Sequence, residues 1–279
     1  MRRAKRNKIR IFLTGILGVF LSVSVLTKAY SADKARFFYC GEQQNVQILL
    51  IDGTSYFPLR YFCEELAGCA VSWDQASRCA KVGKGSIEFD ISETAEYISV
   101  NGRCFYAKGK VFMLDGKLYA ASRLLAKIFS MPISWDGDKS AVMLEKCGEM
   151  LQDGDSYYNS GDLYWLSRII HSESCGEPLD GQIAVGNVVL NRVRSSDYPD
   201  NIHDVIFDEN YGTQFEPAAN GTIDCEPSDK SVAAAKICLE GGSTAEDSIY
   251  FLNPDIAESL WIVENRTFVM KIGNHSFYR

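Results

Sequence analysis

Residues 162–173 read Asp-Leu-Tyr-Trp-Leu-Ser-Arg-Ile-Ile-His-Ser-Glu, and their spacing decides the fold of the C-terminal half of the chain. Leu166, Ile169 and Ile170 fall on one face of a helix, at the spacing of an amphipathic stripe. Glu173 lies seven, four and three residues beyond them, which places it within about 20° of the centre of that face. The stretch therefore predicts a helix whose buried side carries a carboxyl group.

A carboxyl group packed against apolar side chains is disfavoured as an anion, so we expect the pKa of Glu173 to be raised. A carboxylic acid that stays protonated near neutral pH is what general-acid catalysis requires. Two other interpretations are open at this position: the carboxyl pairs with a buried arginine, or it reaches from the helix end into water. The motifs in the rest of the chain favour the catalytic interpretation.

The region around this helix is predicted to be mainly helical. We expect Asp162 to cap the helix at its start, and Gly176 and Pro178 to end it. Asn187 and Asn191 recur on one side of the next predicted helix, where they hydrogen-bond either the substrate or, as we favour, the first helix. Further helices are predicted at 180–194 and 227–240, and strands at 249–252 and 266–272, joined by a loop that contains Trp261.

An internal repeat organises the first half of the chain. Residues 51–60 (IDGTSYFPLR) recur as residues 114–123 (LDGKLYAASR), 63 positions later. An Asp-Gly pair before an aromatic strand predicts a tight turn in each copy, and residues 96–107 predict a hairpin that turns at Asn101-Gly102. Each copy continues with a helical stretch, a Ser-Trp-Asp sequence and a β segment. In the first copy these are residues 61–67, 72–74 and 79–82, and in the second copy residues 124–130, 134–136 and 141–144.

Over residues 44–146, these repeats resemble the N-terminal domain of copper amine oxidases, a stalk-like module of exported bacterial proteins. The resemblance implies a small α+β spacer and neither copper nor oxidase chemistry, and the segment contains no histidine that could bind copper. We expect a stalk-like domain at 40–147, a Gly-, Asp- and Ser-rich linker at 148–161 and a C-terminal domain at 162–279. The stalk would position the downstream domain against the wall or a protein partner; a purely structural spacer is the alternative.

The N-terminus has the features of a secretory signal peptide. Six of the first ten residues are basic, an apolar run follows at 11–26, and Ala29-Tyr30-Ser31 fits the small-x-small rule for cleavage. We predict a signal peptide at 1–31 and a secreted protein; an uncleaved anchor is the alternative. Cleavage would leave 22 Lys and Arg against 36 Asp and Glu, a net charge of −14. Such an acidic chain is not expected to bind nucleic acid through its overall field.

The C-terminal half carries six motifs whose order and spacing are distinctive. They are residues 166–178 (LSRIIHSESCGEP), 181–193 (GQIAVGNVVLNRV), 198–207 (YPDNIHDVIF), 214–217 (QFEP), 250–254 (YFLNP) and 272–279 (IGNHSFYR). Together, over residues 163–279, they resemble the SleB-type cell wall hydrolases, the spore-cortex-lytic family.

The resemblance implies an enzyme that cleaves the glycan strands of peptidoglycan as a lytic transglycosylase, which forms 1,6-anhydro-muramoyl ends. It implies Glu173 as the single catalytic acid, no cofactor, and a role in spore germination or sporulation. With the signal peptide it also implies a secreted protein associated with the cell wall or the spore cortex; spore cortex and vegetative wall both remain open as substrates. The expected fold class is α+β. A duplicated small α+β stalk domain is followed by a mainly α, lysozyme-like domain with a small β element.

A groove that binds sugars needs aromatic platforms and amide donors. Glu177 follows the predicted helix break and is interpreted as a capping or turn residue. Asp204, Asp208, Glu216 and Asp224 lie in predicted loops and leave open a second carboxylate for plain hydrolysis, although similar domains often carry serine at the position of Glu216. Our candidates for substrate binding are Gln214, Phe215, Asn253, Trp261, Asn274, His275 and Tyr278, with packing or loop support as the alternative for each.

Two other function classes compete with glycan cleavage. The three histidines, His171, His203 and His275, could build the zinc site of a metal-dependent wall amidase or peptidase. However, His171 and Glu173 project from nearly opposite helix faces, and the chain has no His-Glu-x-x-His sequence, so we expect no metal. The other competitor is a non-catalytic wall-binding protein whose C-terminal domain binds glycan without cleaving it.

Overall fold

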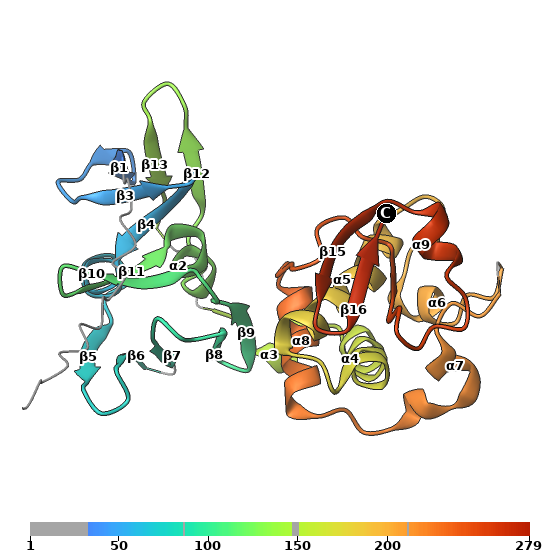
Figure 1. The fold of residues 1–279 in the computed structure, drawn as a ribbon. Helices are drawn as coiled ribbons and strands as arrows, with labels where there is room; N and C mark the ends of the chain where they lie inside the picture. The colour runs from blue at the N-terminus through green and yellow to red at the C-terminus, as the bar shows by residue number, and fades with distance from the viewer. Residues whose placement is uncertain (1–32, 86, 147–150, 211) are drawn as a thin grey trace, which may run out of the picture. The chain divides into compact units, whose positions relative to one another are not determined.

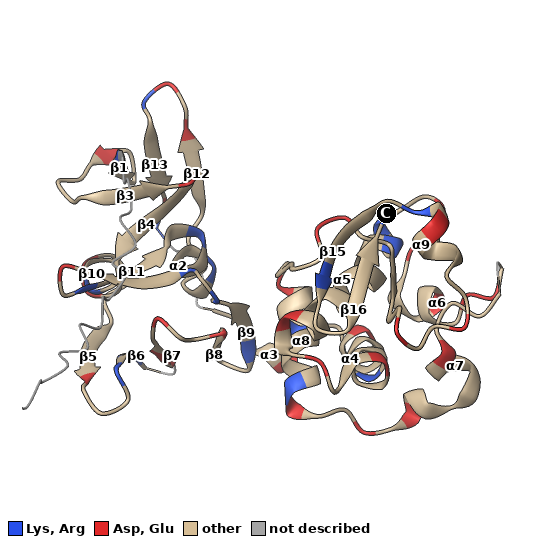
Figure 2. Ribbon diagram, viewed as in Figure 1, with Lys and Arg blue, Asp and Glu red and all other residues tan. Residues whose placement is uncertain are grey.

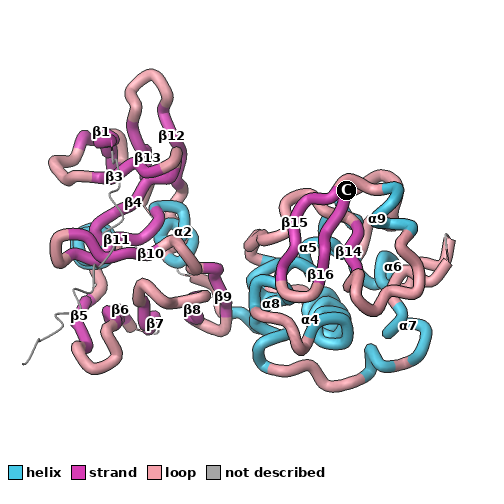
Figure 3. The backbone as a smooth tube through the Cα atoms, in the orientation of Figure 1, coloured by secondary structure: helices cyan, strands magenta, loops and turns pink. Residues whose placement is uncertain are grey.

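A computed structural model describes residues 33–85, 87–146, 151–210 and 212–279 (Figure 1). The predicted signal peptide, residues 1–31, lies outside the described residues. The described residues form one compact unit, and no helix among them is both long and apolar enough to cross a bilayer. Strands dominate up to residue 144 and helices beyond it (Figure 3). The predicted α+β class, with a strand-rich N-terminal part and a helical C-terminal part, is confirmed.

The two copies of the repeat build matching strands, each displaced by 63 residues. They are β3 (Ile48–Ile51) and β4 (Thr54–Pro58) in the first copy, and β10 (Val111–Leu114) and β11 (Lys117–Ala121) in the second. β4 pairs antiparallel with β11, and Phe57 lies opposite Ala120, its own counterpart 63 positions later. An antiparallel pair centred on equivalent residues relates the two copies by a local two-fold axis between these strands.

The helical stretches and hairpins predicted for each copy are also present. In the first copy they are α1 (Leu59–Tyr61), η1 (Phe62–Leu66), β5 (Ala70–Asp74) and β6 (Cys79–Lys84). In the second copy they are α2 (Ser122–Ile128), β12 (Ile133–Asp136) and β13 (Ala141–Leu144). Figure 1 shows β5 and the β12–β13 hairpin at opposite ends of the strand-rich part, with β4 and β11 between them.

Strands outside the repeat complete this part of the chain: β1 (Asp33–Tyr39), β2 (Glu42–Gln43), β7 (Ile87–Ile91), β8 (Tyr97–Val100) and β9 (Arg103–Tyr106). The main sheet runs β10-β11-β4-β3-β1-β13-β12, with β2 beside β1, so it begins before residue 40. β5, β6 and β7 form a second sheet. The β8–β9 hairpin turns as predicted, because Asn101 (φ 48°) and Gly102 (φ 71°) both adopt left-handed backbone.

Three long helices and a small sheet form the C-terminal part. The helices are α4 (Ser160–Ser174), α5 (Leu179–Arg194) and α8 (Asp229–Leu239), and the antiparallel sheet has the order β14 (Tyr250–Leu252), β16 (His275–Tyr278), β15 (Phe268–Ile272). Shorter turns of helix are α3 (Gly154–Tyr157), α6 (Ile202–Ile206), α7 (Glu216–Asn220), η2 (Thr222–Asp224) and α9 (Trp261–Asn265).

The C-terminal part differs from the sequence prediction at four places. β16 was not predicted, and a helix begins at Trp261 where a loop was expected. The segment predicted as a linker contains α3 and the buried side chain of Tyr158. The fourth difference is the start of α4, which Asn159 caps in place of Asp162. Its Oδ1 accepts hydrogen bonds from two backbone N–H groups of the first turn, at 2.9 and 3.0 Å.

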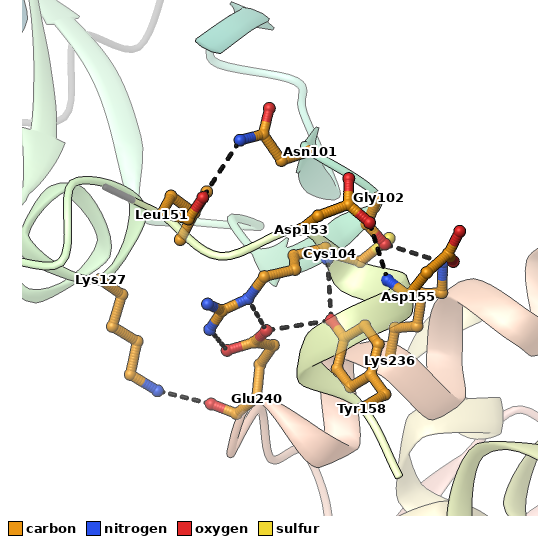
Figure 4. A network of polar contacts seen from close by, with 11 residues as sticks. Asn101, Gly102, Cys104, Lys127, Leu151, Asp153, Asp155, Tyr158, Lys236 and Glu240 are labelled. Atoms are coloured by element: carbon orange, nitrogen blue, oxygen red, sulfur yellow. Dashed lines mark hydrogen bonds and ion pairs between the residues drawn. The ribbon is translucent and has the colours of Figure 1, made fainter. Parts of the chain in front are cut away.

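A buried ion pair connects the β8–β9 hairpin to the end of α8 (Figure 4). Arg103 Nε and Nη2 donate to the two carboxylate oxygens of Glu240 at 2.6 and 2.8 Å. The hydroxyl of Tyr158 donates to Glu240 Oε1 at 2.9 Å, and Lys127 Nζ donates to the Glu240 carbonyl at 2.5 Å. Lys236 Nζ donates to the Gly102 carbonyl at 2.7 Å. The repeat region and the helical region are therefore joined by specific polar contacts.

Candidate active site

Glu173 lies in the last turn of α4, at the end of the apolar stripe that predicted the helix. The stripe packs against α5 and α8, which lie beside α4 in the ribbon (Figure 1). The carboxyl group of Glu173 has no hydrogen bond or ion pair with another described residue, and it lines an open cleft. Leu166, Ile169 and Ile170 are fully buried.

The cleft beside Glu173 has a volume of about 1300 Å³. Its walls come from segments far apart in the sequence: α4, α5, the approach to α7, β14 with the loop after it, α9 and β16. The lining side chains combine carboxyl, guanidinium, amide and aromatic groups. They include Glu173, Arg192, Tyr198, Gln214, Glu216, Tyr250, Asn253, Glu258, Trp261, Arg266 and His275.

The pKa of Glu173 is raised to about 7, well above its ordinary value of 4.5. Burial is the largest cause, because apolar surroundings disfavour the anion. The negative charge of Glu216 raises the pKa further, and the positive charge of Arg192 opposes both effects. Near neutral pH about half of the Glu173 carboxyl groups therefore remain protonated. The expected raised pKa is present, and its cause is the one that the apolar stripe predicts.

Arg192 is a second buried ionisable group of the cleft, and the sequence prediction did not include it. Only 5% of its surface is exposed. Its Nε donates to the Ile249 carbonyl at 2.8 Å, and its Nη1 donates to Gln214 Oε1 at 3.3 Å. The guanidinium also lies 4.9 Å from the ring centre of Phe215, but it forms no ion pair with a carboxylate in the described part of the chain. A positive charge without a paired anion thus lies at the cleft wall.

Two of the predicted amide groups line the cleft. The side chain of Gln214 is held from both ends, since its Oε1 accepts from Arg192 and its Nε2 donates to the Gly212 carbonyl at 3.0 Å. Asn253 lies just after β14, and its Oδ1 accepts from the backbone N–H of Asp255 at 3.1 Å, which leaves its amide nitrogen available. Both side chains are therefore held at the cleft surface, where their amide groups can hydrogen-bond a ligand.

Two of the predicted ring residues also line the cleft. Trp261 is 50% exposed, and the guanidinium of Arg266 lies 4.9 Å from its ring centre. Such an exposed indole is a suitable platform for a sugar ring. His275 packs edge-on to Phe251, with ring centres 5.3 Å apart. Burial lowers the pKa of His275, so its imidazole is neutral at pH 7.

The other three predicted binding residues do not line the cleft. Phe215 and Tyr278 are 1% and 5% exposed and pack in the interior. Asn274 lies in the β15–β16 turn, where its backbone N–H and Nδ2 donate to the carboxylate of Glu177 at 3.0 and 2.9 Å. Glu177 is buried, and it ties that turn to the break between α4 and α5. This arrangement agrees with the interpretation of Glu177 as a turn residue.

The three histidines are dispersed over the C-terminal part. The Nδ1 of His171 lies 3.3 Å from the hydroxyl of Ser231, and the Nδ1 of His203 lies 2.8 Å from the carboxylate of Asp204. His275 alone lines the cleft beside Glu173. Within the described ranges, no three His, Cys, Asp or Glu side chains are placed so that they could hold a metal ion.

The prediction that Asn187 and Asn191 bind the first helix or the substrate is wrong. Asn187 Nδ2 donates to the Gly242 carbonyl at 2.9 Å, and Asn191 Nδ2 donates to the carbonyls of Glu246 and Ser248 at 2.9 and 3.0 Å. Both asparagines therefore fix the chain segment that follows α8. Helical spacing placed them on a common side of α5 but did not reveal which neighbour that side meets.

Comparison with known proteins gives matches for both parts of the chain. Residues 176–278 match the family described as Cell Wall Hydrolase, and residues 40–144 match the Copper amine oxidase N-terminal domain. The spore cortex-lytic enzyme of Oceanobacillus iheyensis is 36% identical over 120 residues, which are 43% of this chain and 42% of that protein. The spore cortex-lytic enzyme of Bacillus subtilis is 32% identical over 120 residues, 43% of this chain and 38% of that protein. The chain thus spans about two fifths of the length of these relatives.

Among solved structures, the catalytic domain of the germination-specific lytic transglycosylase SleB from Bacillus anthracis is 32% identical, with a TM-score of 0.40; the match covers 44% of this chain and 98% of that one. The catalytic domain of the Bacillus cereus SleB protein is 34% identical, again with a TM-score of 0.40, over 44% of this chain and 92% of that one. Both resemblances that the sequence motifs indicated are confirmed by the family matches. The chain therefore carries a domain of the copper amine oxidase N-terminal type followed by a cell wall hydrolase domain.

Proposed function

We propose that the C-terminal domain cleaves the glycan strands of peptidoglycan, with Glu173 as its single catalytic acid. The observation that carries this proposal is a carboxyl group whose pKa is about 7, free of internal partners, in an open cleft. General-acid catalysis is most effective when the pKa of the acid lies near the working pH. The similarity of this domain to spore cortex-lytic enzymes supports a wall glycan as the substrate.

The reaction needs one carboxyl group in two roles. Protonated Glu173 first donates its proton to the glycosidic oxygen as the bond from that oxygen to the anomeric carbon breaks. The resulting carboxylate then accepts the proton of the C6 hydroxyl of the same sugar, whose oxygen attacks the anomeric carbon. The products are a strand end with a free hydroxyl and a 1,6-anhydro-muramoyl end, and Glu173 is again protonated. Because the nucleophile is internal, no second carboxylate is required.

The other cleft residues suit the binding of a sugar chain. We assign Trp261 as a stacking platform, and Gln214, Asn253 and the neutral imidazole of His275 as hydrogen-bonding partners of hydroxyl and acetamido groups. The buried charge of Arg192 has a further effect. It favours the carboxylate form of Glu173, so it stabilises the state that forms after proton donation.

Plain hydrolysis is the second candidate reaction, because Glu216 lines the same cleft as Glu173. In that reaction Glu216 would activate a water molecule, and the product would end in a reducing sugar. Mass analysis of the released muropeptides separates the two reactions, since an anhydro end is lighter than a reducing end by one water molecule. Parallel digests of spore cortex and vegetative sacculi would also identify the preferred wall, for which we propose spore cortex.

We expect cleavage to decrease as the pH rises above about 7. The reactive form of the free enzyme carries the proton on Glu173, and that form becomes scarcer as the pH passes the pKa of about 7. At pH 8 the value of kcat/KM should be about tenfold below its value at pH 6. Initial rates of release of soluble muropeptides from sacculi, measured across this range at constant ionic strength, test the expectation. A rate that is flat or rising up to pH 9 would contradict the assigned role.

We expect Glu216→Ser to move this decrease in rate to lower pH. Removing the negative charge of Glu216 lowers the pKa of Glu173, so the activity at pH 7 should fall about two- to threefold. Glu258→Ser is the matched control: Glu258 lines the same cleft but does not contribute to the raised pKa of Glu173. A loss of about 10²-fold or more in the Glu216 variant, with reducing ends as products of the parent enzyme, would instead identify Glu216 as the base of a hydrolase.

A further inference from the structure

The local two-fold axis of the repeat creates two equivalent surface pockets. The Trp135 pocket, of about 600 Å³, combines Trp135 and Arg123 of the second copy with the Asp-Gly turn region of the first. The Trp73 pocket, of about 840 Å³, combines Trp73 and Arg60 of the first copy with the Asp-Gly turn region of the second. The two tryptophans are 62 positions apart and the two arginines 63, as the repeat requires.

Each pocket presents an indole ring to solvent. Trp135 in β12 is 44% exposed and Trp73 in β5 is 40% exposed. Neither indole ring therefore fills the interior of the sheet, although both copies of the repeat have a tryptophan at this position. A partly exposed indole at the wall of a surface pocket is the type of surface on which a sugar ring stacks.

The charges of the two pockets differ. In the Trp73 pocket Arg60 Nη1 donates to Glu64 Oε1 at 2.6 Å and to the Val71 carbonyl at 3.0 Å, so its charge is already paired. The position equivalent to Glu64 in the second copy is occupied by Lys127. Arg123 consequently has no such partner, and it forms no ion pair with another described residue.

Two cations without a counter-ion thus line the Trp135 pocket. Lys110 is the second, and no Asp or Glu is among the described residues that line this pocket. Burial and the nearby charge of Lys127 lower the pKa of Lys110, as expected for an ammonium group without a neighbouring anion. Figure 2 shows Lys and Arg on α2, which supplies Arg123 and Lys127. The chain as a whole has a net charge of −7, so the positive charge of this pocket is opposite in sign to that of the whole chain.

We infer that the Trp135 pocket binds a carboxylate-bearing segment of a peptidoglycan strand. Trp135 stacks on a sugar ring, while Arg123 and Lys110 bind a free carboxylate of the stem peptide. The identity of the ligand rests on the proposed function, because a domain that cleaves wall glycan must be held at its substrate. The Trp73 pocket is larger and differs in charge, because Glu64 and Glu65 line it beside Arg78 and Lys117, and its Arg60 is paired with Glu64. A ligand carboxylate would meet these two negative charges there, so the Trp73 pocket does not offer the same carboxylate site.

The test measures binding of the full chain to a soluble disaccharide-peptide of peptidoglycan by titration calorimetry, in a Glu173→Gln background so that the ligand stays intact. Arg123→Ala and Trp135→Ala should each weaken binding about tenfold, the loss expected for one charge-assisted or stacking contact. The equivalent changes in the other pocket, Arg60→Ala and Trp73→Ala, are the matched controls and should change affinity less than twofold. Binding should also weaken as salt is added.

A neutral oligomer of N-acetylglucosamine separates the two contacts. Trp135→Ala should weaken its binding, whereas Arg123→Ala should leave it unchanged because no carboxylate is present. Equal losses from the two pockets, or no loss from Arg123→Ala with the peptide-bearing ligand, would overturn the inference. The cleavage rate of the parent enzyme, measured separately, reports on the cleft alone, so a failure of binding in the pocket is distinguishable from a failure of the proposed reaction.

Discussion

The variant Glu173→Gln is expected to lose cleavage of peptidoglycan by about 10²- to 10⁴-fold. Glutamine has nearly the same shape as protonated glutamic acid, but its amide cannot transfer a proton to a glycosidic oxygen at neutral pH. The cleft and its other lining side chains should be unchanged, so binding of intact strands should persist. The measurement is the rate of muropeptide release from sacculi, with circular dichroism as the check that the fold remains.

The same variant should be at least as stable as the parent protein at pH 8. Because the pKa of Glu173 is raised in the native state, the native state binds more protons at this site than the unfolded state between pH 4.5 and 7. The free energy of unfolding therefore falls as the pH rises through this window, and the loss is complete above about pH 7. Glutamine removes the buried charge, so Glu173→Gln should recover up to about 3 kcal/mol at pH 8 and little at pH 4.

These two readouts together distinguish a catalytic acid from a structural residue. A structural glutamate, such as Glu177 with its two hydrogen bonds to Asn274, should lose stability and activity together when it is replaced. Glu258→Gln in the same cleft is the matched control, and this variant should retain both the stability and the activity of the parent protein. An active Glu173→Gln protein would refute the assignment of this residue, whatever its stability.

The position of Glu173 could be predicted because it depends only on helical periodicity. Three apolar residues define one side of α4, and the carboxyl group that follows them must lie at the edge of the core. The same reasoning finds Arg192, which lies seven, four and three residues beyond Val185, Val188 and Val189. Those three valines are fully buried, and Arg192 is the charged residue that extends their stripe into the cleft.

Which candidate binding residues line the cleft was harder to predict, because it depends on tertiary contacts. His275 and Tyr278 belong to a strand that was not predicted, and only the ring of His275 reaches the cleft. The side chain of Asn274 donates a hydrogen bond to Glu177, which lies 97 positions earlier in the sequence. No local pattern encodes such a contact. The duplicated strands, in contrast, were predictable, because the repeat presents the same turn and strand signals twice.

We expect Glu240→Gln to reduce the free energy of unfolding by about 3–5 kcal/mol, the typical cost of breaking a buried ion pair from one side. The side chains of Arg103 and Glu240 are 9% and 5% exposed, and both guanidinium contacts run to the same carboxylate (Figure 4). An amide at residue 240 would leave the arginine charge buried without its counter-charge. Urea denaturation at pH 7 gives the free energy of each variant.

The exposed pair of Arg279 and Glu246 provides the matched control for this prediction. Its side chains are 49% and 61% exposed, so Glu246→Gln should cost less than about 1 kcal/mol. Replacing both members of the buried pair, Arg103→Leu with Glu240→Leu, should cost less than Glu240→Gln alone, because no unpaired charge remains. With the single variants Arg103→Leu and Glu240→Leu, this double variant completes a double-mutant cycle, whose coupling energy measures the interaction directly. An equal loss of unfolding free energy in Glu240→Gln and Glu246→Gln would contradict this prediction. The contact between the β8–β9 hairpin and α8 would then be open to solvent, and the two parts of the chain would be joined mainly through their covalent connection.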